Sequence, residues 1–163
     1  MMLTVERLRE LLHYDPKTGV FTWRVRRGSR APLGGIAGSI NADGYRLIGL
    51  EGIRYLAHRL AWLYMTGVFP PNVDHRNRRN DDNRWSNLRA ATKAQNSWNR
   101  PMQANNKSGF KGVSYSKSNR GWVAQIMANR RKIHLGTFAT PLVAATVYER
   151  ASRKYHGDFA KVR

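Results

Sequence analysis

One stretch of the sequence, VDHRNRRNDDNRWSNLRAATKAQNSWNR from Val73 to Arg100, combines residue types that can do chemistry. It holds the pair Asp74-His75 among many Asn and Arg, a mixture that a solvated basic loop does not need. A carboxylate offers a hard oxygen to a divalent cation, and a neutral imidazole can accept a proton near neutral pH. Hydrolysis of a phosphodiester requires a base, a water molecule and positive charge on the phosphate oxygens. The stretch therefore suggests such a reaction.

Two Asn residues of this stretch stand at positions where they can complete a site. Asn87 is expected in a loop, where its side-chain amide can bridge backbone groups. Asn96 is expected in the first turn of a helix, where its amide oxygen can join Asp74 as a metal ligand. Neighbouring strand residues point to opposite faces, so Asp74 and His75 can serve one site only where their strand ends irregularly.

The segments DH, NRWSNL and TKAQNSWNR together resemble the HNH endonuclease family, which has a ββα-metal site. The resemblance implies two catalytic residues, His75 to activate water and Asn87 to orient the loop. It also implies one divalent cation bound by Asp74 and Asn96. Asn96 replaces the His of many members, a departure shared with phage-type nicking members. Since imidazole and thiolate ligands are absent, Mg²⁺ or Mn²⁺ is the expected ion.

The same residues allow two other interpretations. The stretch DHRNRRNDDN can be a polar turn whose Asp and Asn only cap and solvate the chain. It can also be a calcium loop, although Arg76, Arg78 and Arg79 interrupt the acids and no Gly-then-Glu pattern follows. His58 precedes the motif, where related nucleases often have a His, and we expect it to pack or to contact phosphate.

The formal net charge of +19 indicates a polyanionic partner. Double-stranded DNA is the first expectation and structured RNA a weaker one. No membrane partner is expected, because no stretch approaches the ~20 apolar residues of a membrane-spanning helix. The chain has no Cys, and its first residues lack the layout of a secretory signal. We therefore expect a cytoplasmic protein, in the bacterial host if a phage encodes it.

The elements that must position the motif are short. Alternating apolar residues separated by Gly-rich turns predict antiparallel strands at residues 20–25, 36–40, 45–50 and 53–58. Thr4 can cap a helix through about Leu12, and a second helix is expected from His58 to about Met65, ended by Gly67. A third should begin with the capping box Thr92-x-x-Gln95 and stop near Arg100, because Pro101 follows.

The residues beyond 108 predict a second unit of three strands and one helix. The strands are expected at 110–116, 121–127 and 132–138, and the helix between the N-cap Thr140 and Gly157. This unit resembles the AP2 DNA-binding domain, with a Gly-Val near its start, Trp-Val-Ala-x-Ile, Leu-Gly-Thr-Phe and an Ala- and Tyr-rich helix. A sheet of this kind can lie in a major groove.

Strand alternation assigns the two faces of this sheet: Trp122, Ala124 and Ile126 share one side, and Gln125 lies on the other. The AP2 resemblance implies contacts to bases or phosphates on the exposed side. Ser114, Met127 and His134 stand where plant members have Arg or Trp, so the plant target sequence does not transfer. With the basic residues of the first unit, the candidate DNA-binding residues are Arg76, Arg78, Arg79, Arg100, Lys111, Gln125, Arg130, Arg131, Lys132 and His134.

The whole chain is thus expected to be an α+β protein. Residues 1–100 would form an HNH nuclease domain with an N-terminal β-rich extension, 101–107 a linker and 108–163 an AP2-like DNA-binding domain. The expected function is that of a site-selective, metal-dependent DNA endonuclease of nicking or homing type, acting as a monomer or weak dimer. The alternative is a DNA-binding transcriptional regulator that keeps the HNH scaffold but does not cut.

Overall fold

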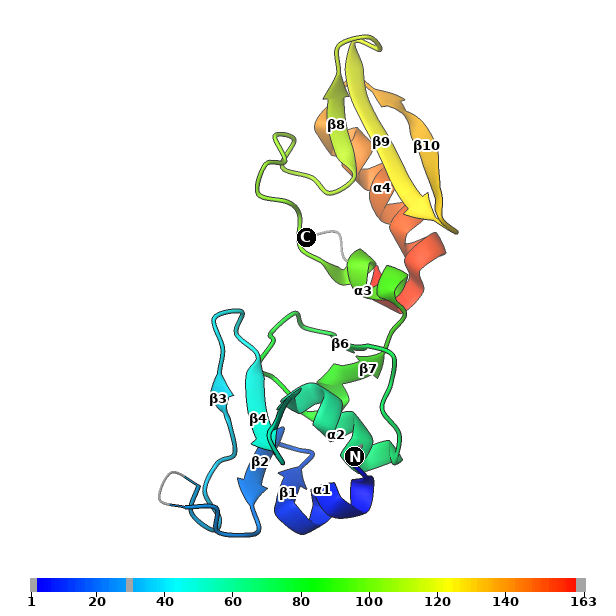
Figure 1. The fold of residues 1–163 in the computed structure, drawn as a ribbon. Helices are drawn as coiled ribbons and strands as arrows, with labels where there is room; N and C mark the ends of the chain where they lie inside the picture. The colour runs from blue at the N-terminus through cyan, green and yellow to red at the C-terminus, as the bar shows by residue number, and fades with distance from the viewer. Residues whose placement is uncertain (1–2, 29–30, 161–163) are drawn as a thin grey trace. The chain divides into compact units, whose positions relative to one another are not determined.

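The computed structural model describes residues 3–28 and 31–160. The chain divides into two compact units, residues 1–93 and 94–163 (Figure 1). Both contain helices and small antiparallel sheets. No helix among the described residues is long and apolar enough to cross a membrane.

The first unit begins with a capped helix and a hairpin. The side chain of Thr4 accepts a hydrogen bond from the backbone N–H of Arg7 and caps the helix, as predicted. Leu12 was expected inside this helix but is the first residue of a strand that the sequence did not reveal. The elements are α1 (Val5–Leu11), β1 (Leu12–Asp15) and β2 (Val20–Trp23), and β1 pairs antiparallel with β2.

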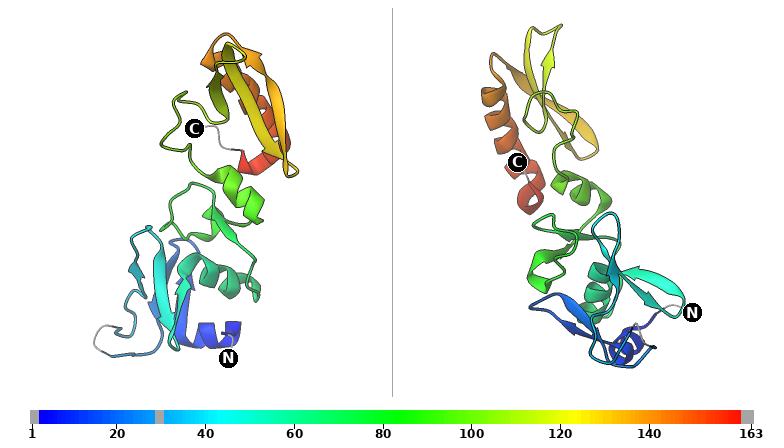
Figure 2. Two further views of the ribbon diagram at one scale, coloured as in Figure 1. Left: turned by 45° about the horizontal axis from the view of Figure 1, so that its top comes forward. Right: turned by 90° about the vertical axis from the view of Figure 1, so that its left-hand side faces the viewer.

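A central helix packs against the rest of the first unit (Figures 1 and 2). It is α2 (Ala57–Thr66), which contacts α1 and the sheet of β3 (Ser39–Ile40), β4 (Arg46–Leu50) and β5 (Ile53–Leu56). The helix ends at Gly67, whose φ of 79° is left-handed, as its predicted stop requires. Phe21, Ile48 and Leu60 lie in the core without solvent exposure.

The rest of the first unit is a small two-stranded sheet with an intervening loop. Its elements are β6 (Val73–His75), the 3₁₀ turn η1 (Trp85–Asn87) and β7 (Leu88–Ala90). Strand β6 also contacts α2, which ties this hairpin to the core.

The second unit is a three-stranded antiparallel sheet with a long helix on one face (Figure 2). The predicted Thr140 cap and the stop at Gly157 are both present in its long helix. Val113, Ala124, Ile126 and Tyr148 form the centre of the core. The elements are α3 (Lys93–Asn99), β8 (Val113–Ser116), β9 (Gly121–Ala128), β10 (Arg131–Phe138), α4 (Pro141–His156) and η2 (Gly157–Phe159), and the sheet order is β10-β9-β8.

The segment 101–107, which the sequence presents as a linker, belongs to the second unit. The side chain of Asn106 accepts hydrogen bonds from the backbone N–H of Ser108 at 2.8 Å and of Gly109 at 3.2 Å, and its amide donates to the carbonyl of Phe110 at 3.0 Å. The end of this segment is therefore part of a hydrogen-bonded turn that precedes β8.

Candidate active site

The Asp-His pair lies on β6, opposite β7. The register places Asp74 opposite Arg89 and His75 opposite Leu88. His75 is the last residue of β6, and the chain then turns into the Arg-rich loop 76–84. Because neighbouring strand residues point to opposite faces, the side chains of Asp74 and His75 leave β6 on different sides.

The side chain of Asn87 cross-links the two arms of this loop by hydrogen bonds. Its Oδ1 accepts a hydrogen bond from the backbone N–H of Asn77 at 3.0 Å, and its Nδ2 donates to the carbonyl of Asp82 at 2.7 Å. The backbone N–H of Arg76 donates to the carbonyl of Asn87 at 2.9 Å. The buried amide thus bridges backbone groups on both arms of the loop, which is the contact expected from the sequence.

The imidazole of His75 is buried in the first unit, with 5% of the residue exposed. Its Nε2 lies 3.1 Å from Oδ1 of Asn83. A carboxamide oxygen only accepts, so Nε2 carries the proton in this pair and Nδ1 carries the lone pair. Burial lowers the pKa of His75, and the bond to Asn83 and the charge of Asp74 oppose this shift in part. His75 is therefore neutral at pH 7, the state of a general base.

Asn83 is held in place by the N-terminal hairpin, and no signal in the sequence pointed to it. The residue is 1% exposed, and the hydroxyl of Tyr14 donates to its carbonyl at 2.6 Å. The backbone N–H of Trp85 donates to the carbonyl of Pro16 at 3.0 Å. Gly19 packs so closely that a Cβ there would lie 2.4 Å from the carbonyl carbon of Asn83. The N-terminal extension thus fixes the residue that bonds His75.

A second buried histidine packs against the first. The ring of His58, on α2, lies edge-on to that of His75 with centroids 4.9 Å apart, and Tyr45 contacts both rings. His58 is 6% exposed, and burial lowers its pKa to about 3. Of the two roles considered for His58, the structure shows packing.

Asp74 forms a buried ion pair. Its Oδ2 accepts from Nε of Arg89 at 2.7 Å and lies 2.6 Å from Nη2. Among the described residues, no group of three or more His, Cys, Asp and Glu is placed to hold a metal. The donor chemistry nevertheless suits Mg²⁺, which proteins commonly bind through one or two carboxylates while it keeps several waters. A metal ion at Asp74 would compete with Arg89 for the same carboxylate.

The basic loop between β6 and β7 is exposed. Arg76, Arg78 and Arg79 all lie at the surface, where they can meet phosphate. Within the same loop Arg84 pairs with Asp82, and its hydrogen bonds are the main cause that lowers the pKa of Asp82 to about 2. This pair joins the two residues that flank Asn83 in the sequence.

Two residues of the predicted site belong to the second unit. Asn96 is half-buried within α3, and Arg100 is exposed just beyond the end of this helix. The binding of a metal by Asn96 stays a prediction from the motif. The helix itself begins one residue after Thr92 and ends at Asn99, close to the predicted bounds.

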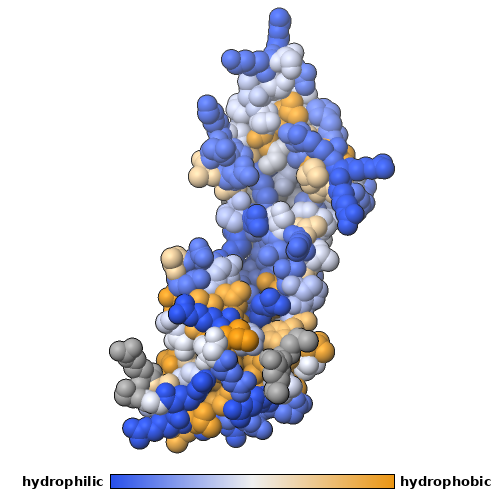
Figure 3. All heavy atoms as spheres, in the orientation of Figure 1, coloured by the Kyte–Doolittle hydropathy of each residue, from blue (hydrophilic) through white to orange (hydrophobic). Residues whose placement is uncertain are grey.

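The structure brings three candidate DNA-binding residues together on the sheet face opposite α4. Gln125 pairs with His134, and Lys132 pairs with Met127, on adjacent strands β9 and β10. Lys132 and His134 are exposed and Gln125 is partly exposed. Arg130, in the turn between these strands, and Arg131, the first residue of β10, are also exposed. In Figure 3, hydrophilic side chains gather over the ends of this sheet.

Lys111, another candidate DNA-binding residue, lies before β8 and not on β9 or β10. Its Nζ donates to the backbone carbonyls of Trp98 and Arg100, at 2.5 and 2.8 Å. The DNA contact that the AP2 resemblance suggests for this side chain stays a prediction.

Comparison with known proteins supports a nuclease. Residues 55–98 match the family model for HNH endonuclease. Protein 3.8 of Escherichia phage T7 is 32% identical over 108 residues, which are 65% of this chain and 88% of the phage protein. The chain belongs to the family of T7 Protein 3.8 and carries an HNH endonuclease domain. No solved structure matches the chain significantly.

The HNH match contains most of the residues that the structure brings together around His75, although Tyr45 lies outside it. His58, Asp74, His75, Asn83 and Asn87 all lie within residues 55–98, and so does Asn96. HNH nucleases generally use a divalent metal ion, and a nuclease domain implies DNA as the substrate. The match ends before β8, so it does not extend to the sheet of the second unit.

Proposed function

We propose that this protein is a site-selective, divalent-metal-dependent DNA endonuclease. The observation that carries the proposal is the buried, neutral His75, whose Nε2 is bonded to Asn83 inside a loop that Asn87 closes. This constellation lies within residues that match the HNH endonuclease family.

In the proposed reaction, His75 acts as general base through Nδ1. It takes the proton from a water molecule whose oxygen attacks the phosphorus, and the bond from phosphorus to the leaving oxygen breaks. That oxygen takes a proton from solvent. Asn83 keeps the proton on Nε2 throughout, and Asn87 keeps the loop closed around the base.

Asp74 and Asn96 are the proposed metal ligands, and the assignment of Asn96 rests on the motif spacing. When bound, a divalent cation, most simply Mg²⁺ and alternatively Mn²⁺, supplies positive charge at the phosphate oxygens. The exposed Arg76, Arg78 and Arg79 draw the DNA backbone to the loop by charge.

The second unit is proposed to contribute DNA binding in the manner of the AP2 domain that its sequence resembles. The partly exposed Gln125 and the exposed Lys132 and His134 share one face of a three-stranded sheet, which has the shape to enter a major groove. One metal site per chain predicts cleavage of one strand at a time, as in nicking or homing enzymes of phage. A double-strand break would need dimerisation or sequential nicks.

A non-cleaving DNA-binding regulator is the second candidate, and the Asp74–Arg89 pair favours it. A carboxylate that is neutralised by a buried guanidinium has less attraction for a cation. The two functions predict similar salt-sensitive DNA affinity, so binding alone does not separate them.

Incubation with supercoiled plasmid or phage DNA and Mg²⁺ or Mn²⁺ separates them. We expect wild type to convert supercoiled to open-circular DNA and His75→Ala to lose this activity while still binding DNA. His13→Ala is the matched control, because His13 is exposed on β1. If wild type binds its target tightly but leaves it intact with every divalent ion, the protein is a regulator.

A further inference from the structure

The helix that ends the HNH domain packs with residues outside that domain. The match to the HNH family ends at residue 98, within α3. Apart from its first residue, α3 falls in the compact unit 94–163. The helix has seven residues, and an isolated helix needs about 12–15 to be even marginally stable in water. Contacts within the second unit must therefore hold it.

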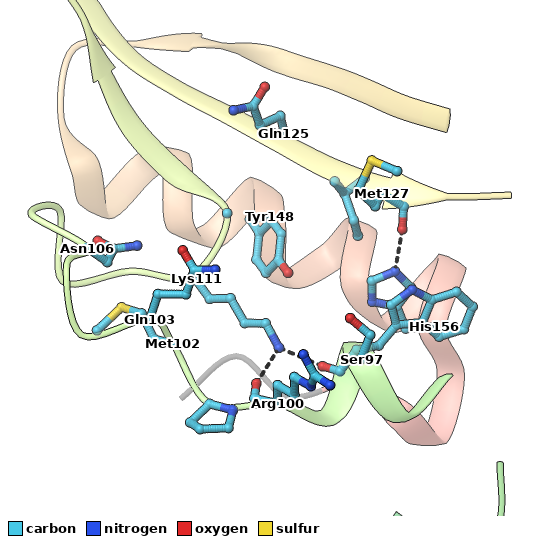
Figure 4. Close-up of a pocket in the computed structure, with 14 residues that line it drawn as sticks. Ser97, Arg100, Met102, Gln103, Asn106, Lys111, Gln125, Met127, Tyr148 and His156 are labelled. Atoms are coloured by element: carbon cyan, nitrogen blue, oxygen red, sulfur yellow. Dashed lines mark hydrogen bonds between the residues drawn. The ribbon is translucent and has the colours of Figure 1, made fainter. Parts of the chain in front are cut away.

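Lys111 provides the first of these contacts. Its Nζ donates to the carbonyls of Trp98 and Arg100, at the C-terminal end of α3 (Figure 4). The last carbonyls of a helix have no partner within the helix, and a cation there also offsets the negative end of the helix dipole. Lys111 is half-buried, and it borders a pocket of about 450 Å³ that α3 and β9 also line.

Trp98 provides the second contact. Its indole stacks on the imidazole of His156, with ring centroids 4.2 Å apart and planes 9° apart. His156 is buried near the end of α4, and its Nε2 donates to the carbonyl of Met127 on β9 at 2.8 Å (Figure 4). The stack thus ties α3 to both layers of the second unit.

Residues from other segments also line this pocket. The hydroxyl side of Tyr148 and the side chains of Met102 and Gln103 line it beside Lys111 (Figure 4). Removing the ammonium group of Lys111 would take the hydrogen-bond donor away from the carbonyl of Trp98, in the last turn of α3, and from that of Arg100, just beyond the helix. The Trp98 stack on His156 would remain as a contact between α3 and α4.

We propose that Lys111 is a positioning residue of the nuclease, and that the second unit is needed for the cleavage step because it holds α3. This inference rests on the proposed function, in which α3 carries the metal ligand Asn96. It changes the role of the second unit, which is then a structural part of the nuclease as well as a DNA-binding module.

Substitution in the full chain tests the inference. The variants are Lys111→Met, which keeps the aliphatic stem, Lys111→Arg, which can still donate to both carbonyls, and the control Lys117→Met in the exposed β8–β9 turn. Hydrogen exchange of the amides of residues 94–100 reports the order of α3. Single-turnover cleavage at saturating DNA and DNA affinity at several salt concentrations are measured on the same proteins.

We expect Lys111→Met to raise hydrogen exchange in α3 and to slow cleavage by about tenfold or more. This factor corresponds to the loss of at least one hydrogen bond to a charged donor. DNA affinity and its salt dependence should stay close to wild type. Lys111→Arg should restore most of the rate, and Lys117→Met should leave the exchange of α3 and the cleavage rate unchanged.

Two results would overturn the inference: unchanged exchange in α3, or increased exchange with unchanged cleavage. A Lys111→Met protein that loses affinity and salt dependence instead would show a DNA contact, as in the AP2 resemblance. If wild type does not cut DNA at all, the proposed function fails. The exchange measurement then still tests the contact: increased exchange in α3 of Lys111→Met shows that Lys111 holds the helix, and unchanged exchange shows that it does not.

Discussion

Asp74 and Arg89 face each other across β6 and β7 and form a buried ion pair. Their side chains are 5% and 8% exposed, and Nη2 of Arg89 lies 2.6 Å from Oδ2 of Asp74. Each charge loses its hydration on burial and is compensated by the other. The pair therefore links the stability of the HNH hairpin to the carboxylate that is proposed to bind a metal.

Replacing Arg89 by Met should strongly destabilise the protein. The substitution leaves the Asp74 carboxylate buried without its counter-charge, and breaking a buried pair in this way costs about 3–5 kcal/mol. Urea unfolding followed by Trp fluorescence measures the loss. Arg84→Met is the control, because the Arg84–Asp82 pair is half-exposed on the arginine side and its loss should matter much less. Equal losses for the two variants would contradict the prediction.

Replacing Asn83 by Ala should slow cleavage without weakening DNA binding. General bases contribute about 10²–10⁴ to a rate, and loss of the residue that sets the tautomer should forfeit about tenfold to a hundredfold of it. Asn80→Ala is the control in the same loop, since the Asn80 side chain donates to the carbonyl of Asp43 at 2.8 Å. Single-turnover rates with saturating DNA measure both variants. A rate for Asn83→Ala equal to that of wild type would show that His75 does not depend on this bond.

Most of the secondary structure was predictable because its signals are local. Thr4 and Thr140 cap helices, and Gly67 and Gly157 end them, in agreement with the sequence. The first strand was missed because Leu11 and Leu12 both continue the apolar pattern of α1. Whether Leu12 extends the helix or starts a strand depends on pairing with Trp23, a contact that the local pattern does not contain.

The site was predictable only as far as the motif extends. The spacing pointed to His75 and to the bridging role of Asn87. Both residues lie in the hairpin formed by β6, β7 and the loop between them. The ion pair of Asp74 depends on the register of two strands, and the support of Asn83 by Tyr14 joins residues 69 positions apart. Contacts of this kind follow from tertiary packing, which a single sequence does not display.

Stability should fall as the pH is lowered below about 6.5, mainly because of His58. Burial lowers its pKa from 6.5 to about 3 in the folded protein. Between these values the unfolded chain binds a proton that the folded chain excludes. The contribution of His58 to the free energy of unfolding is therefore fully present above pH 6.5 and is lost as the pH falls towards 3. The limiting slope is about 1.4 kcal/mol per pH unit for one group.

Urea midpoints measured between pH 7 and 4 check this slope. His58→Phe keeps an aromatic ring without a titrating group, so its stability should fall less steeply with acid than that of wild type. Burial also lowers the pKa of His75, which leaves a residual dependence of the same sign. Parallel curves for wild type and His58→Phe would show that His58 is not the group responsible.

Gly112 should be intolerant of a side chain. Its φ is 71°, and a Cβ there would lie 2.0 Å from the ring of Tyr148 in the core of the second unit. Gly109 is a matched control, with a φ of 74° and nothing within 4 Å of its would-be Cβ. Gly109→Ala should cost about 1–2 kcal/mol for its backbone alone, and Gly112→Ala about 1–3 kcal/mol more for the clash. Similar unfolding free energies for the two variants would mean that Tyr148 moves aside.

Replacing Lys132 by Ala should weaken DNA binding and leave the chemistry intact once DNA is bound. Lys132 is exposed on the sheet face that also bears Gln125 and His134, and each lost phosphate contact lowers the slope of log affinity against log salt by about one. The control is Lys154→Ala, because Lys154 is exposed on α4, which covers the opposite face of the sheet. Affinities at several salt concentrations, together with single-turnover rates at saturating DNA, measure the two effects separately. An unchanged salt slope for Lys132→Ala would remove this face from the DNA-binding surface, and a lowered rate at saturation would assign Lys132 to the reaction instead.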